Sequence, residues 1–176
     1  MMLRSGLGLN PWDVFHEGLA ERTLLSFGTV VIISGAFVLL LWIPLRERPG
    51  LGTISNMLVI GLAADLGLWL LPEITLLSAQ SAILAGGIIL DGIATSAYIG
   101  AGFGPGPRDG LMTGVAARTG WSIRRVRTGI ELTVLATGWI LGGTVGVGTI
   151  LYAVLIGSIV HLTLPFLMAT AARPGS

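Results

Sequence analysis

The sequence predicts an all-α bundle of transmembrane helices, and three observations point to that fold class. Of the 176 residues, 53% are hydrophobic and only 11% are charged, whereas a soluble domain carries about 25% charged residues. Five apolar runs are each about 20 residues long, enough to cross a bilayer. Residues 3–80 also match residues 99–176 at a constant offset of 96, with 22 identities in 78 pairs. We therefore expect a single membrane domain over residues 1–176.

The five spans are separated by short or glycine-rich loops. In chain order, they are predicted at residues 27–45, 51–71, 76–100, about 124–142 and 146–168. The loop between the first two is only "RERPG", so these spans form a hairpin, and the last two form a second hairpin. The N-terminal segment "MMLRSGLGLNPWD" has no apolar core of the kind found in signal peptides.

Two further helices are predicted from a shared skeleton, G-x-x-P-x-D-x-x-x-x-G. It occurs as "GLNPWDVFHEG" at 8–18 and as "GPGPRDGLMTG" at 104–114. Proline is favoured as the first residue of a helix, and an acidic side chain in the first turn complements the helix dipole. Helices over 11–21 and 107–117 follow from this pattern. Each is followed by a serine that can cap the next span. The residues concerned are Pro11, Asp13, Ser26, Pro107, Asp109 and Ser122.

The two motifs leave two interpretations open. They can serve only to start the short helices. Alternatively, both helix N-termini lie partly in the membrane and offer free N–H groups to an anion. Arg108 adds a positive charge to the second motif only, because its counterpart at the offset of 96 is Trp12.

The arginines predict how the chain is oriented in its membrane. All ten positive residues are arginine. Because successive loops lie on alternate sides of the membrane, Arg4 and Arg22 are on one side and the other eight arginines are on the opposite side. Those eight are Arg46, Arg48, Arg108, Arg118, Arg124, Arg125, Arg127 and Arg173. The excess marks the cytoplasmic side, so the visible N-terminus is expected outside and the C-terminus inside.

One repeat period contains three spans, so the two copies are expected to be inverted relative to each other, as in many secondary transporters. Repeat 1 covers 3–75 and repeat 2 covers 76–176. Repeat 1 has no counterpart to the span at 76–100. The expected architecture is thus an incomplete 3+3 inverted repeat of five visible spans, with the first helix of repeat 1 missing. On this view, the chain is a shortened form of a six-span unit.

Four segments carry a resemblance to a known family: "SGLGLNPWDVFHEGLAERT", "RPGLGT", "GPRDGLMTGVAARTG" and "GGTVGVGT". Together they resemble the YczE-like group of bacterial multi-pass membrane proteins, related to the YitT type. The resemblance covers nearly the whole chain. It implies a six-span fold in a bacterial cytoplasmic (plasma) membrane but supplies no substrate.

Four ionisable residues fall inside the predicted spans, namely Asp65, Asp91, Glu131 and His161. Charges at membrane depth are costly and are functional candidates by default. Glu131, His161 and Asp91 each lie roughly 12 Å from the cytoplasmic end of their span, which predicts that they share a cluster. Two other interpretations stay open: an i,i+4 pair of Glu131 with Arg127, and a hydrogen bond between helices for His161.

These observations favour a small secondary-transporter-like protein for an unidentified small solute or ion. The predicted solute contacts are Asp13, Asp91, Arg108, Asp109, Glu131 and His161. A non-transporting membrane scaffold or accessory protein is the alternative. An enzyme is not expected, because the chain has no cysteine or lysine, only two histidines and no G-x-S-x-G motif; no cofactor or metal is expected either.

The expected partners are the lipid bilayer, a small anionic or polar solute and further copies of the chain. Nucleic acid is not among them, because a net charge of +1 provides no basic surface.

Overall fold

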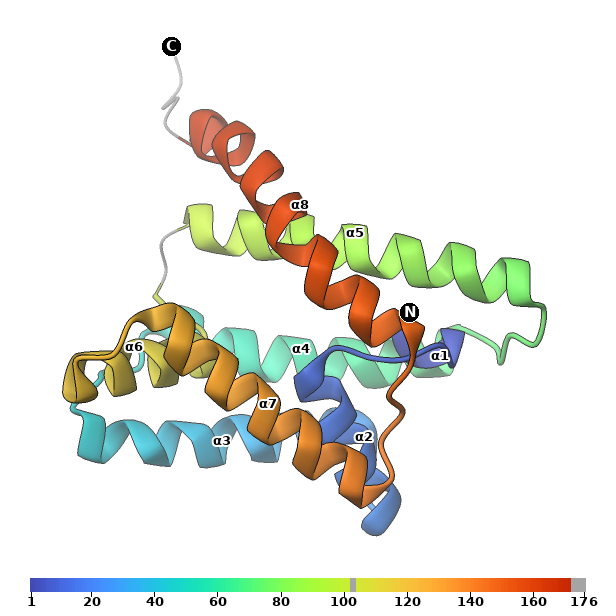
Figure 1. Ribbon diagram of the computed structural model, residues 1–176, viewed down its shortest axis with the longest axis horizontal. Coiled ribbons are helices and arrows are strands. Elements are labelled where there is room, and N and C mark those ends of the chain that lie inside the picture. The colour runs from blue at the N-terminus through green and yellow to red at the C-terminus, as the bar shows by residue number, and fades with distance from the viewer. Residues whose placement is uncertain (102–103, 172–176) are drawn as a thin grey trace. The chain divides into compact units, whose positions relative to one another are not determined.

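The computed structural model describes residues 1–101 and 104–171, and all regular structure in those residues is helical (Figure 1). The helices are α1 (Met2–Ser5), α2 (Pro11–Arg22), α3 (Phe27–Leu45), α4 (Leu51–Leu70), α5 (Leu77–Ala101), α6 (Pro107–Thr119), α7 (Ile123–Leu141) and α8 (Val147–Ala171). Arg173 and the C-terminal end, on which part of the predicted orientation depends, lie outside the described residues.

Four helices are long and apolar enough to cross a membrane: α3, α4, α5 and, over Val147–Phe166, α8. They coincide with four of the five predicted spans. The fifth predicted span corresponds to α7, which is as long as α3, at 19 residues. It carries Arg124, Arg125, Arg127 and Glu131, and so it is not among the helices that qualify by composition. Its crossing of the membrane stays a prediction.

The predicted helix starts are confirmed at both motifs. α2 begins at Pro11 and α6 at Pro107. The hydroxyl of Ser26 accepts a hydrogen bond from the Thr29 N–H at 3.2 Å. Ser122 does the same for the Arg125 N–H at 3.4 Å. Each serine therefore satisfies a backbone donor that the first turn of its helix leaves free.

The chain forms two compact units. Unit 1 comprises Met1–Asn10, Leu71–Phe103 and Val145–Ser176, and it contains α1, α5 and α8. Unit 2 comprises Pro11–Leu70 and Gly104–Thr144, and it contains the other five helices. The units interleave along the chain and do not follow the predicted repeats. A single membrane domain stays a prediction.

Unit 1 is held together by close packing of α5 against α8. Gly92 contacts Ile159, and the Ser96 hydroxyl lies 2.6 Å from that of Thr163. Small residues of this kind let membrane helices approach closely and form hydrogen bonds across the interface. The N-terminal segment joins the same unit, because the Gly148 N–H donates to the Leu7 carbonyl at 2.7 Å.

Unit 2 contains two related helix crossings, in which α2 packs on α7 and α6 packs on α3. At one, the Trp42 indole fits against Gly110; at the other, Gly138 fits against the backbone of Val14. Trp42 and Gly138 are 96 residues apart, and so are Val14 and Gly110. The two crossings thus place a glycine at equivalent contact positions, on the short helix in one crossing and on the long helix in the other.

The ends of the long helices in unit 2 are contacted by two arginines that follow the same offset. Nε of Arg22 donates to the Leu141 carbonyl at 3.0 Å. Arg118, which is 96 residues later, donates to the Pro44 carbonyl. Each arginine of a short helix therefore satisfies a C-terminal carbonyl of the long helix on which that short helix packs.

Candidate functional site

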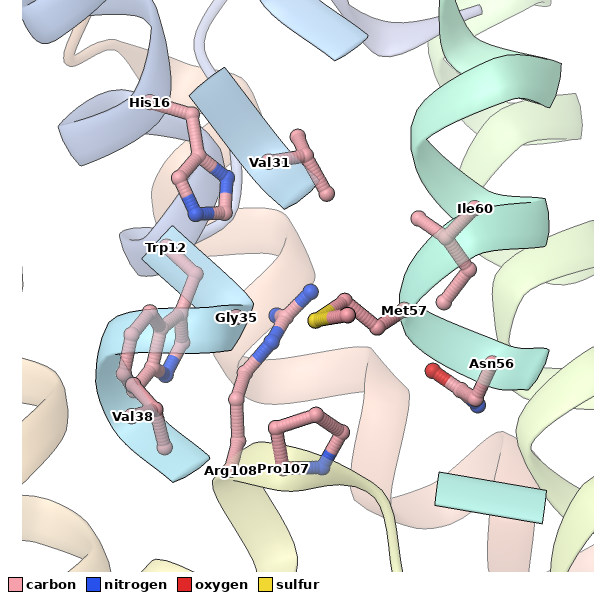
Figure 2. A pocket seen from close by; sticks show the side chains of 10 residues that line it. All are labelled: Trp12, His16, Val31, Gly35, Val38, Asn56, Met57, Ile60, Pro107 and Arg108. Carbon is pink, nitrogen blue, oxygen red and sulfur yellow. The ribbon is translucent and has the colours of Figure 1, made fainter. Parts of the chain in front are cut away.

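A cavity of about 30 Å³ lies in unit 2, where the first turns of α2 and α6 meet α3 and α4 (Figure 2). Its lining is Trp12, His16, Val31, Gly35, Val38, Asn56, Met57, Ile60, Pro107 and Arg108. None of these ten residues is acidic. The α3 residues are central: Gly35 comes eight residues after Phe27 and ten before Leu45, or roughly 12 and 15 Å from the two helix ends.

The start of α6 is held in place by two buried side chains. Trp42 is 1% exposed, and its Nε1 donates to the Pro107 carbonyl at 3.0 Å. The Thr53 hydroxyl donates to the Pro105 carbonyl at 2.7 Å and accepts from the Gly50 N–H. These hydrogen bonds anchor the loop before α6 on α3 and α4. Arg108, which directly follows Pro107, is thereby placed in the cavity wall.

Arg108 is half-buried, and the nearest acidic influence on it is electrostatic, from the carboxylate of its neighbour Asp109. Its guanidinium carbon lies 5.3 Å from the centre of the Trp12 ring, and among the described residues the structure records no hydrogen bond or ion pair for it. Stacking on an aromatic ring contributes about 0.5–2 kcal/mol, whereas withdrawing a cation from water costs several kcal/mol. The tryptophan therefore offsets only part of the desolvation of this charge.

Two nitrogen atoms beside Arg108 are buried without a hydrogen-bond partner: Nε1 of Trp12 and Nδ1 of His16. Trp12 is 7% exposed and His16 is 2% exposed. Figure 2 shows the five-membered part of the indole on the side that faces Arg108. Because buried polar atoms are nearly always satisfied, these two mark a position where the protein itself leaves hydrogen bonds unmade.

His16 is packed among aromatic rings, with Phe27 in edge-on contact at 6.0 Å between ring centres. Its Nδ1 lies 3.5 Å from an Asp13 carboxylate oxygen, too far for a good hydrogen bond. Burial lowers the pKa of His16 below its ordinary value; Arg108 on α6 adds to this, and Asp13 opposes it. The imidazole is consequently neutral at pH 7.

The predicted solute contacts are distributed unevenly around this cavity. Arg108 lines it, and Asp13 is not part of the wall but lies beside the lining residue His16. Asp109 is exposed in the first turn of α6 and is not part of the wall. The Nε–Oε1 distance between Arg127 and Glu131 is 2.9 Å, which confirms the i,i+4 interpretation of Glu131.

The other charged residues of the spans also have positions in the structure. Tyr152 donates its hydroxyl to Asp91 at 2.8 Å in unit 1, and His161 is exposed on α8. Glu131 belongs to unit 2 and the other two to unit 1, so the predicted cluster of the three stays a prediction.

Asp65 caps α3 from the neighbouring helix α4. Its carboxylate accepts hydrogen bonds from the Ser26 hydroxyl at 2.6 Å and the Gly28 N–H at 2.7 Å. An ionised carboxylate is well suited to the free N–H groups at a helix start. This contact explains the charge in α4 without a ligand.

Nine of the ten lining residues were not among the predicted contacts, and three of those nine have polar side-chain groups: Trp12, His16 and Asn56. One signal was available for the first two, because residues four apart lie on the same face of a helix. Nothing in the sequence pairs Asn56 with the motif at 104–114. Among the described residues, no group of three or more histidine, cysteine or acidic side chains could hold a metal ion.

Comparison with known proteins assigns the family. A model described as "Family of unknown function (DUF6198)" matches residues 1–165. The chain belongs to the DUF6198 family. It is 38% identical over 160 residues to the uncharacterized membrane protein YczE of Bacillus subtilis, covering 90% of this chain and 74% of that protein. The predicted resemblance to YczE-like proteins is confirmed.

Two further relatives of this DUF6198 chain are similar over most of its length. An uncharacterized protein of Haemophilus influenzae is 40% identical over 164 residues, which is 93% of this chain and 75% of the relative. The B. subtilis protein YyaS is 29% identical over 169 residues, or 94% and 84% of the two chains. No solved structure matches. With four candidate spans and a membrane-protein relative, the chain is a membrane protein.

Proposed function

We propose that this DUF6198 protein is a small secondary-transporter-like protein whose solute occupies the cavity at Arg108. In this proposal, α7 is a fifth span, and the sequence repeats form an inverted pair in the plasma membrane with the C-terminus in the cytoplasm. The related crossings at Trp42 and Gly138 support a two-fold relation between α2–α7 and α6–α3. The arginine distribution supports the orientation.

The observation that carries the proposal is an arginine with no ion pair recorded within the described chain, in the wall of a cavity against the middle of a candidate span. The wall includes the first turns of two short helices, one of which contributes Pro107 and Arg108. Secondary transporters bind their solutes near the bilayer midplane, where interrupted helices present free N–H groups. Non-helical backbone is tolerated at that depth only when it is enclosed by protein or lines a cavity. Asp91 and His161 remain candidates for a further polar position in unit 1.

A membrane scaffold is the second candidate, and one observation favours it. The carboxylates of Asp65, Asp91 and Glu131 all have protein partners. Their presence in apolar helices therefore requires no transported solute. In a scaffold, the cavity at Arg108 would hold only water.

Osmotic reswelling of proteoliposomes separates the two candidates. Vesicles containing the purified full chain are shrunk in hyperosmotic potassium chloride, nitrate or formate with valinomycin present, or in urea or glycerol. Light scattering then reports solute entry. We expect at least one solute to enter faster than in protein-free vesicles, with the gain lost in Arg108→Ala and retained in the exposed control Arg124→Ala. Equal rates for every solute, with folded protein in the vesicles, would support the scaffold instead.

A further inference from the structure

We infer that the cavity at Arg108 binds one small monovalent anion, of the size of chloride, nitrate or formate, through the Arg108 guanidinium and the Trp12 indole N–H. The inference rests on the proposed function only in treating this cavity as the solute site. It adds the charge, the size and the contacts of the ligand.

The charge of the ligand follows from the hydrogen-bonding groups in the wall. Guanidinium and indole nitrogens donate hydrogen bonds and cannot accept them. Both groups are available, because Nε1 of Trp12 is buried without a partner and Arg108 has no recorded ion pair within the described chain. A cation would need carboxylate or carbonyl oxygens, and no acidic residue lines the cavity. The donors therefore select an anion.

The size of the ligand follows from the cavity. A water molecule needs about 10–15 Å³ of such space, so about 30 Å³ admits an ion of one to a few atoms. Amino acids, sugars and nucleotides are too large to be enclosed in this volume. The single arginine in the wall, beside a neutral His16 and already interacting electrostatically with Asp109, balances at most one negative charge. A divalent anion would leave one charge without a counter-charge in the wall, which is costly away from water.

Two features hold the donors in place before a ligand arrives. The Trp42–Pro107 hydrogen bond fixes the first turn of α6, and Trp12 is packed in a buried cluster with Val38, Trp42 and Leu111. Side chains that are already ordered lose little further entropy on binding. An anion would therefore replace water beside a fixed charge without rearranging the helices.

Equilibrium dialysis with radioactive chloride tests the inference on the full chain in nonionic detergent. We expect one saturable site per chain, displaced by bromide, nitrate and formate but not by gluconate at equal ionic strength. Arg108→Ala should lose binding, and Arg108→Lys, which keeps the charge, should retain part of it. Trp12→Phe keeps the ring but removes the donor, so it should weaken binding about tenfold or more. The exposed matched controls Trp121→Phe and Arg124→Ala should bind like the native protein.

Three outcomes would overturn the inference: no saturable chloride binding by protein with a native thermal midpoint, unchanged binding in Arg108→Ala, or displacement of chloride by added phosphatidylglycerol. The last would assign the guanidinium to a lipid phosphate. Anion binding without solute entry in the vesicles would sustain the inference and reject transport. Entry of urea or glycerol without anion binding would support transport and reject the anion site. The two proposals can therefore fail separately.

Discussion

Replacing Gly138 by alanine tests whether α2 and α7 touch backbone to backbone. A Cβ at this position would lie 2.5 Å from Cα of Phe15 and 2.6 Å from the carbonyl carbon of Val14. Ordinary contact begins at 3.4 Å, so the two helices must separate by about 0.9 Å. Backbone atoms cannot rotate away as a side chain can. Overfilling a packed position of this kind costs about 1–3 kcal/mol.

The matched control is Gly129 on the same helix, where an added Cβ meets nothing within 4 Å. Both substitutions gain about the same helix propensity, up to 1 kcal/mol, so the difference between them isolates the steric cost. At about 2–4 °C per kcal/mol for a chain of this size, Gly138→Ala should melt roughly 2–12 °C below Gly129→Ala. Thermal unfolding of detergent-solubilised protein, followed by tryptophan fluorescence, measures the gap. Equal midpoints for the two variants would refute the proposed contact.

Three further predictions concern buried polar groups. The folded pKa of His16 lies below its unfolded value of 6.5. The contribution of His16 to stability is therefore complete above pH 6.5 and is lost as the pH falls toward the folded pKa. The thermal midpoint of His16→Gln should fall less between pH 8 and pH 5 than that of the native protein. Asp65→Asn should lower the midpoint by weakening the cap of α3, at a cost of about 1–3 kcal/mol; no change would mean that the cap contributes nothing. Trp42→Phe should weaken chloride binding in the dialysis assay, although Trp42 is outside the cavity wall, because the Pro107 carbonyl loses its donor; the exposed control Trp139→Phe should have no effect.

Most helix boundaries could be predicted because they depend on local chemistry. Proline at the first helical position, a serine cap and a run of apolar residues act within a few neighbours along the chain. α3 accordingly begins and ends where the apolar run does, at Phe27 and Leu45. α7 also has nearly the predicted boundaries. However, because it carries several arginines and Glu131, its composition does not qualify it as a membrane-spanning helix.

The cavity could be predicted only in part, because its wall depends on contacts between distant segments. Arg108 was identifiable from its charge in a Gly/Pro-rich loop. The packing of Trp12 beside Arg108, and the tertiary hydrogen bond from Trp42 to Pro107, join residues 96 and 65 positions apart. Asp91 shows the same limit in reverse: its partner Tyr152 is 61 residues away, and no local pattern relates the two.

The packing of α2 on α7 has a consequence for biosynthesis. Gly138 is made 123 residues after Phe15 (138 − 15), which it contacts. At about 5–20 residues per second, a nascent chain waits roughly 6–25 s between the two. During that interval, Val14 of α2, which is fully buried in the finished protein, lacks its α7 partner. The hydrogen bond from Arg22 to the Leu141 carbonyl must also wait for the end of α7. Early release, or a translational pause before residue 138, would therefore leave α2 without this partner and accessible to quality-control proteases.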